Sequence, residues 1–259
     1  MSSNRDLWLN ASFTKTACPE WNCPTCKTGK LTVAPANVYS TETRDSIQHR
    51  DDPDWEAYWI SYKFSASLKC DNAKCADVVV TSGWGSVEEG YIETDNDWYS
   101  EYYDSFRPEF FTPHLNYFTI ESACPKIIQD EINKSFSLFF LDAHSCANKI
   151  RIAIELLMNE FKIPSSRINK GKRIGLSLHA RIIKFGLKYP KITNALLAIK
   201  WIGNAGSHTS PIEKKDIIDA YDILEHSLTE IFSTKTKETE KIVKEINKKK
   251  APRSKGKQH

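Results

Sequence analysis

Two pairs of cysteines place the strongest constraint on how the N-terminal part of this chain can fold. Cys23 and Cys26 are separated by two residues and followed by Gly29, and a second pair, Cys70 and Cys75, has a four-residue spacer. A Cys-x-x-Cys turn closed by a glycine is typical of a zinc knuckle, because it holds two thiolates on one tight turn. We expect the four thiolates to hold one structural Zn²⁺ per chain in a closed tetrahedral site.

Cys18 leaves part of this ligand set open, because it lies close enough in sequence to replace Cys23 or Cys26. Free buried thiols or a redox pair are further interpretations of the same cysteines. A disulfide framework would fit a secreted protein, but the chain shows no apolar run of the signal-peptide type. It also has no apolar stretch of about 18 residues. We therefore expect a soluble cytoplasmic protein with no membrane contact.

The residues around the second cysteine pair alternate between apolar and polar. Residues 58–68 follow the period of a β-strand that leads into Cys70, and residues 78–84 predict the returning strand of a hairpin. Together with the cysteine turns, these strands predict a zinc-ribbon β module over residues 1–87. Residues 88–104 then hold seven acidic side chains and no Lys or Arg, with aromatic residues interleaved. We interpret residues 88–124 as an acidic, aromatic connector that packs on a flanking domain or docks the basic tail.

From Pro125 onward, the apolar period changes to that of an amphipathic helix. Helices are predicted near residues 125–140, 142–161, 173–187, 191–202 and 211–232, with a polar loop at residues 164–172. These five helices predict a bundle over residues 125–232. The expected fold class is therefore α+β, mainly α: a zinc-ribbon β module followed by a helical bundle. Arg151 and Glu155 form an i,i+4 pair, which we interpret as an ordinary solvated ion pair.

A turn rich in small residues separates the last two predicted helices and presents His208. Ser210 as N-cap, Pro211 at the first helical position and Glu213 in a capping box predict that the following helix begins at Pro211. An imidazole in such a turn suits acid or base chemistry near neutral pH. A capping or packing role for this histidine is the alternative.

The net charge of +3 combines a basic C-terminal segment with an acidic remainder. Residues 233–259 hold ten Lys or Arg and three Glu, and we interpret the basic patch as a property of this tail, not of the fold. The first part of the tail is expected to extend the last helix, and the end to be disordered. Such a tail attracts phosphate without sequence choice, although solubility is an equal alternative. The predicted nucleic-acid-binding residues are Lys248, Lys249, Lys250, Arg253, Lys255 and Lys257.

The helical half carries two motifs, Arg151-Ile-Ala-Ile-Glu155 and Lys200-Trp-Ile-Gly-Asn-Ala-Gly-Ser-His208. In this order, after a cysteine ribbon, they resemble family 4145 of the bacterial domains of unknown function, over roughly residues 125–232. The hallmark of that family is a Gly-Asn-x-small-small-His turn, which this chain matches over residues 203–208. The family is in turn similar to the HEPN superfamily (higher eukaryotes and prokaryotes nucleotide-binding domain).

HEPN proteins are helical bundles that often dimerise, and many are metal-independent ribonucleases of toxin, restriction and phage-defence systems. The resemblance implies a HEPN-like bundle, a homodimer through that bundle, and RNA, DNA or a defence protein as partner. It also implies that His208 acts as acid or base and that Asn204 positions the substrate. Gly203 stands where those nucleases carry an arginine that stabilises phosphate charge, and Lys200 is the nearest cation.

Three functions follow from these observations. We expect first a non-catalytic or weakly catalytic module that binds nucleic acid or a partner protein, in a bacterial defence or restriction system. The glycine at the arginine position and the structural metal favour this interpretation. The alternative is a metal-independent ribonuclease that uses His208, Asn204 and Lys200. A structural subunit of a larger assembly is the third.

Overall fold

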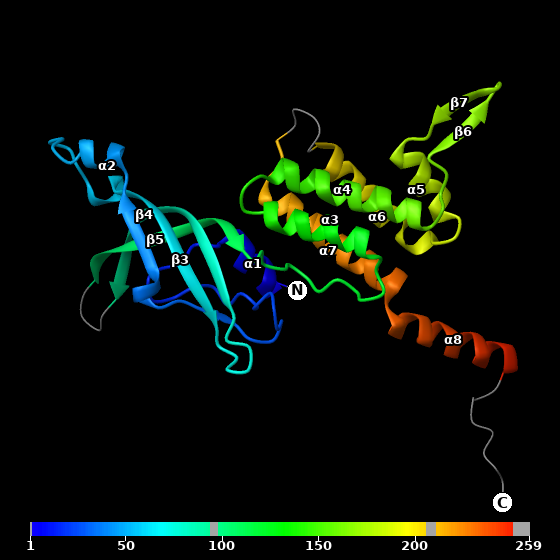
Figure 1. The fold of residues 1–259 in the computed structure, drawn as a ribbon, viewed down its shortest axis with the longest axis horizontal. Helices are drawn as coiled ribbons and strands as arrows, with labels where there is room; N and C mark the ends of the chain where they lie inside the picture. The colour runs from blue at the N-terminus through cyan, green and yellow to red at the C-terminus, as the bar shows by residue number, and fades with distance from the viewer. Residues whose placement is uncertain (1, 94–97, 206–210, 251–259) are drawn as a thin grey trace, which may run out of the picture. The chain divides into compact units, whose positions relative to one another are not determined.

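Figure 1 shows a computed structural model of the chain, which describes residues 2–93, 98–205 and 211–250. The chain forms two compact units. The first combines Met1–Tyr117 with Asn133–Ala143, and the second combines Phe118–Ile132 with His144–His259. Among the described helices, none combines the length and the apolar character that crossing a membrane requires.

The first unit is built on one antiparallel sheet, which curls along its length (Figure 1). The strand order is β1-β3-β4-β5, and β2 also pairs with β3. The strands are β1 (Leu31–Thr32), β2 (Val38–Glu42), β3 (Ser61–Cys70), β4 (Val78–Glu93) and β5 (Trp98–Thr112). Short helical segments accompany them: α1 (Ser2–Leu9), η1 (Pro35–Asn37), α2 (Arg44–Gln48) and η2 (Ala57–Trp59).

Aromatic side chains fill the core of this unit on one face of the sheet. Phe106 of β5 is fully buried and lies beside Phe13 and Phe64, with ring centroids 5.7 and 5.1 Å away. The backbone of Phe13 also exchanges two hydrogen bonds with that of Phe106, so the N-terminal segment is fixed to the sheet. A second aromatic group surrounds Trp8, whose ring lies 4.9 Å from that of Phe139. These contacts bury Trp8 and Phe13 of the N-terminal segment.

The predicted fold class is wrong for the N-terminal half, which is not a small zinc ribbon. The β3–β4 hairpin that leads away from Cys70 is present, with Lys69 opposite Val78. However, β4 and β5 are 16 and 15 residues long, and residues 88–93 and 98–112 of the segment that we expected to be a connector belong to them. Glu89 lies opposite Tyr102 there, in a regular antiparallel register. Aromatic residues favour strands, and the acidic charge of this segment hid that preference.

The second unit is helical, and it takes in the first residues of α3. Its elements are α3 (Lys126–Leu138), α4 (Ala143–Glu160), β6 (Ser166–Asn169), β7 (Lys172–Gly175), α5 (Leu178–Gly186), α6 (Pro190–Ala205), α7 (Lys214–Phe232) and α8 (Thr234–Lys249). The core forms between α4, α5, α6 and α7, each of which contributes fully buried residues. Tyr221 of α7 is completely buried, and its hydroxyl lies 3.1 Å from Cys146 Sγ of α4.

The predicted bundle of five helices is also wrong, because a β-hairpin separates α4 from α5. β6 and β7 cover most of the expected polar loop and the start of the expected third helix. Lys170 and Gly171 join them with φ of 47° and 77°, as in a two-residue hairpin turn. The last predicted helix of the bundle, α7, begins at Lys214 and not at Pro211. Glu213 is its N-cap and forms a capping box with Asp216.

Candidate metal centre and basic pocket

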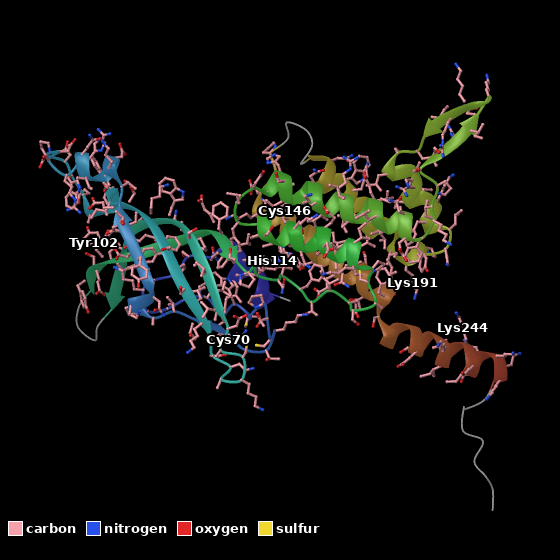
Figure 2. The ribbon with its side chains drawn as sticks, in the orientation of Figure 1. Cys70, Tyr102, His114, Cys146, Lys191 and Lys244 are labelled. Atoms are coloured by element: carbon pink, nitrogen blue, oxygen red, sulfur yellow. The ribbon has the colours of Figure 1, made fainter. Side chains whose placement is uncertain are left out.

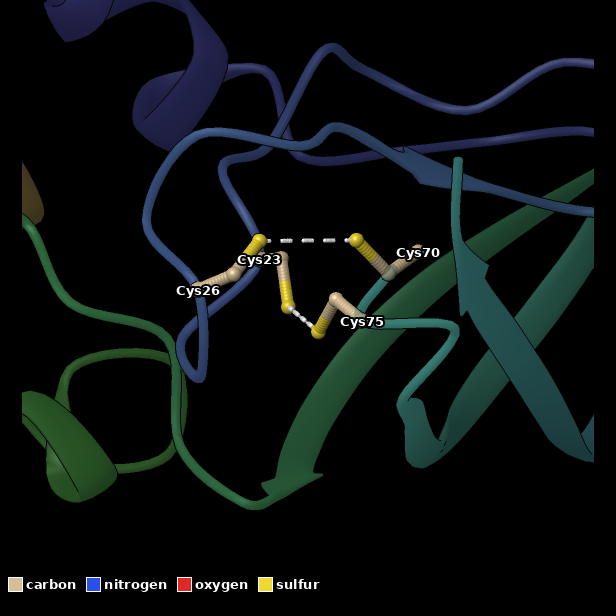
Figure 3. A group of neighbouring side chains, drawn as sticks. All are labelled: Cys23, Cys26, Cys70 and Cys75. Atoms are coloured by element: carbon tan, nitrogen blue, oxygen red, sulfur yellow. Dashed lines mark hydrogen bonds between the residues drawn. The ribbon is translucent and has the colours of Figure 1, made fainter. Parts of the chain in front are cut away.

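Four cysteines of the first unit bring their sulfur atoms together. The Sγ atoms of Cys23, Cys26, Cys70 and Cys75 all lie within 4.8 Å of one another. Figure 3 shows one pair contributed by the turn before β1 and the other by the end of β3 and the turn that follows it. The sequence-predicted metal ligands therefore converge, although they are separated by more than forty residues along the chain.

The backbone around the first pair is shaped for a sulfur site. Lys27 adopts a left-handed conformation with φ of 63°, and its N–H donates to the carbonyl of Cys23 at 2.9 Å. The N–H of Gly29 then points at Cys26 Sγ, 3.3 Å away. A Cβ at Gly29 would overlap Cys70 Sγ. A glycine is therefore needed here, because any side chain would occupy the place of the second cysteine pair.

The spacing of the sulfur atoms fits a tetrahedral metal ion. A Zn–S bond of about 2.3 Å in a regular tetrahedron separates the sulfurs by about 3.8 Å. The structure has 3.9 Å between Cys23 and Cys75 and 3.7 Å between Cys26 and Cys70. None of the seven cysteines forms a disulfide. The donor set therefore fits a metal that prefers four thiolates.

Cys18 is not part of this cluster, so the alternative ligand set is excluded. Its thiol donates to the carbonyl of Leu31 at 3.2 Å, and burial raises its pKa to about 11. Within the cluster, the N–H of Gly29 is the main cause that lowers the pKa of Cys26 to about 5, whereas burial raises the pKa of Cys70 to about 12. Four thiolates this close require a cation to ionise together.

The second unit contains a pocket of about 340 Å³ at the meeting point of α4, α5 and α6. Its lining is basic and aromatic, with a few polar groups. The lining residues are Arg151, Ser177, Leu178, His179, Lys200, Trp201 and Asn204. Two of the three residues predicted as catalytic, Lys200 and Asn204, therefore lie in one pocket. The third, His208, lies outside the described residues.

The predicted ion pair between Arg151 and Glu155 is present, but part of the Arg151 guanidinium is buried. Its Nε atom is buried and has no hydrogen-bond partner among the described residues, with Glu155 Oε1 3.4 Å away. Gly203 of α6 packs against it, because a Cβ there would lie 2.9 Å from Arg151 Cβ. The glycine lets α6 approach α4 closely and leaves room for the Arg151 side chain. The positions of Arg151 and Gly203 in the sequence do not show that α4 and α6 pack this closely.

Lys200 is the second cation of the pocket, and it is 6% exposed. Its Nζ lies over the ring of Trp201, 2.9 Å from the centroid, and that ring is itself exposed. Burial, and next the charge of Arg151, lower the pKa of this lysine. The two cations therefore repel each other across the pocket, a situation that a bound anion would relieve.

The helical unit is more basic than the net charge suggests. Residues 161–212 hold ten Lys or Arg and no Asp or Glu. The basic patch is thus not confined to the tail, as we had inferred from its charge, because acidic residues elsewhere mask the excess in the sum. In the tail itself, Lys248, Lys249 and Lys250 are exposed at the end of α8. The other predicted tail residues, Arg253, Lys255 and Lys257, lie outside the described residues.

Comparisons with known proteins give two matches to families of unknown function. Residues 11–111 match the model of a domain of unknown function, DUF8608. No match to the chain was found among curated proteins or among solved structures. Residues 133–249, which hold the basic pocket, match the model of the domain of unknown function DUF4145, the family that the helical motifs resemble.

Proposed function

We propose that this protein is a nucleic-acid-binding module whose helical unit holds backbone phosphate in the Arg151–Lys200 pocket. One observation carries the proposal: two cations from different helices line the same pocket, and one of them is a buried lysine. The Arg151 side chain lines the pocket and is 32% exposed, so its guanidinium would donate to a phosphate oxygen there. The phosphate would also offset the repulsion that lowers the pKa of Lys200.

Two further features of the pocket support a nucleotide as occupant. The first turn of α5 lines it, and the N-cap Ser177 accepts from the N–H of Ala180 at 3.2 Å. Backbone N–H groups at a helix N-terminus favour anions. The indole of Trp201 is 60% exposed at the pocket, and an exposed ring of this kind stacks with nucleic-acid bases.

The binding proposal is tested by fluorescence anisotropy with labelled RNA and DNA, single-stranded and duplex. We expect Arg151→Gln and Lys200→Gln each to weaken binding about tenfold, because each substitution removes one charge-assisted hydrogen bond to phosphate. Lys126→Gln is the matched control, because it removes one exposed cation from α3, outside the pocket. Equal affinity of the pocket variants and the control, with all three folded, would refute the pocket as the binding site.

We propose further that the four-cysteine cluster of the first unit binds a structural Zn²⁺. The support is the sulfur spacing and the donor set, since four thiolates leave no open position for substrate. The residues of the cluster join the turn before β1 to the end of β3. The metal would therefore stabilise the sheet and take no part in chemistry.

A metal-independent ribonuclease is the second candidate, and the position of Arg151 favours it. The turn lacks the arginine of HEPN nucleases, but Arg151 brings a guanidinium to the pocket that Lys200 and Asn204 also line. In this mechanism Arg151 stabilises phosphate charge, and His208 acts as acid or base. Incubation of labelled single-stranded RNA in EDTA tests it. Cleavage by the wild type, and none by His208→Ala or Arg151→Gln, would establish the enzyme.

A further inference from the structure

The β6–β7 hairpin leaves the helical unit and covers none of it. Every residue from 167 to 175 is exposed, and Ile168 is 80% exposed. The two strands pair only with each other, in a two-stranded sheet of their own. Figure 1 shows the hairpin standing away from α4 and α5, and Figure 2 shows its side chains projecting on both sides. A hairpin of two strands gains little stability alone, and we call this exposed hairpin the arm.

The charge of the arm identifies the chemistry of its occupant. Arg167, Lys170, Lys172 and Arg173 give it four cations in ten residues, within a segment that has no acidic side chain over residues 161–212. Such a surface attracts a polyanion. The arm carries no aromatic residue, so it lacks the stacking platforms typical of single-strand binders.

We propose that the β6–β7 hairpin enters the major groove of double-stranded DNA. The inference rests on the proposed nucleic-acid binding and names the form of nucleic acid. The major groove of B-form DNA, about 12 Å wide, admits a two-stranded ribbon without distortion, whereas strands enter the minor groove of about 6 Å only when the duplex is bent and that groove is widened. The major groove of duplex RNA is too narrow for side chains to read.

The strand register assigns different side chains to the two faces of the arm. Asn169 lies opposite Lys172, and Arg167 lies opposite Ile174, so these four share one face. Arginine, lysine and asparagine are the residues that bond to guanine and adenine in the major groove. On the other face, Arg173 Nε donates to Ser166 Oγ at 2.9 Å. The face of Arg167, Asn169 and Lys172 therefore points at the bases.

The base of the arm is fixed to the helices and continues into the basic pocket. The N–H of Leu176 donates to Ser165 O at 2.8 Å, which closes the hairpin. The loop between α4 and β6 is held by Arg181 of α5. Its Nη2 atom donates to Asn159 Oδ1 at 2.6 Å and to Ile163 O at 3.0 Å. The pocket residue Ser177 follows two positions after β7. A duplex on the arm therefore lies next to the phosphate pocket.

The test replaces Arg167, Lys170, Lys172 and Arg173 together by serine in the full-length chain. The control replaces four exposed cations of α8, Lys241, Lys244, Lys248 and Lys249, by serine. Binding to a random DNA duplex of about 30 base pairs is measured over a salt series of about 50 to 200 mM. We expect the arm variant to bind at least about tenfold more weakly, and its log–log salt slope to fall by about 0.9 for each phosphate that it no longer neutralises. The control variant should keep most of the wild-type affinity and most of the wild-type salt slope.

A duplex whose minor groove is filled by netropsin should still bind, and one whose major groove carries glucosylated cytosines should not. Duplex binding that the arm variant retains, or an arm variant that loses affinity for RNA and not for DNA, would overturn the inference. If only Arg151→Gln and Lys200→Gln weaken binding, the proposed function stands and the arm has no part in it. If the wild type binds no nucleic acid at low salt, both proposals fail.

Discussion

Gly203 of α6 lies against the side chain of Arg151 of α4, so closely that a Cβ on the glycine would be 2.9 Å from Arg151 Cβ and 3.4 Å from the carbonyl oxygen of Ala147. Arg151 of α4 lines the pocket, and the glycine makes room for its side chain. The absence of an arginine from the turn therefore does not leave the pocket without one.

Gly203→Val is expected to destabilise the helical unit by about 1 to 3 kcal/mol, the usual effect of overpacking a close helix contact. The gain in helix propensity of valine over glycine is a few tenths of a kcal/mol and does not offset this. Gly175→Val is the control, since a Cβ there would meet nothing within 4 Å. Urea denaturation of both variants measures the difference. Equal free energies of unfolding would contradict the close packing of α6 on α4.

Cys23→Ser and Cys70→Ser are expected to abolish binding of one metal ion per chain, because three thiolates and a hydroxyl make a much weaker site for Zn²⁺. Cys18→Ser should retain the metal, because the Cys18 thiol donates to the carbonyl of Leu31 and lies outside the cluster. Elemental analysis of the purified proteins, together with thermal melting, measures both. Retention of a full equivalent in Cys23→Ser would show that the cluster is not the site.

The pairing of the four cysteines was predictable, because the spacing within each pair is typical of a metal-binding turn, and the structure adds that the two pairs converge and that Cys18 lies outside the cluster. The length of the sheet was not predicted from the sequence. The acidic residues around Glu89 suggested a connector, whereas the aromatic residues that pair with them favour a strand. The arm was missed for a similar reason. Its Lys170-Gly171 turn lies between Arg167-Ile168 and Arg173-Ile174, a hairpin signal that we interpreted as a polar loop.

The pocket shows a different limit. Lys200 and Asn204 are four residues apart on one helix, so their common position follows from helical periodicity. Arg151 joins them only through the packing of α6 on α4, which depends on tertiary contacts and not on local spacing. The ion-pair interpretation of Arg151 and Glu155 was correct about the pair, which is present at 3.4 Å. It did not reveal that the guanidinium nitrogen is buried.

Arg181→Met is expected to cost about 1 to 3 kcal/mol of stability, because it removes the donor of two hydrogen bonds and leaves Ile163 O and Asn159 Oδ1 without them. The methionine keeps most of the buried apolar stem, so packing changes little. Lys184→Met, on the same helix but exposed, is the control. Thermal unfolding measures the difference in stability, and hydrogen exchange of β6 and β7 should rise in the Arg181 variant alone. An unchanged melting temperature would mean that this arginine does not anchor the arm.

Binding of nucleic acid at the pocket is expected to weaken as the pH rises toward the alkaline range. Lys200 binds phosphate in its charged form, and burial, followed by the charge of Arg151, lowers its pKa from the ordinary value of 10.5. The charge is therefore present below this lowered pKa and absent above it, so affinity should begin to fall at a lower pH than an ordinary lysine would cause. Lys200→Arg keeps its charge throughout and should remove this part of the pH dependence. Anisotropy titrations of both proteins across the alkaline range measure it, and identical pH profiles would show that Lys200 does not bind the phosphate.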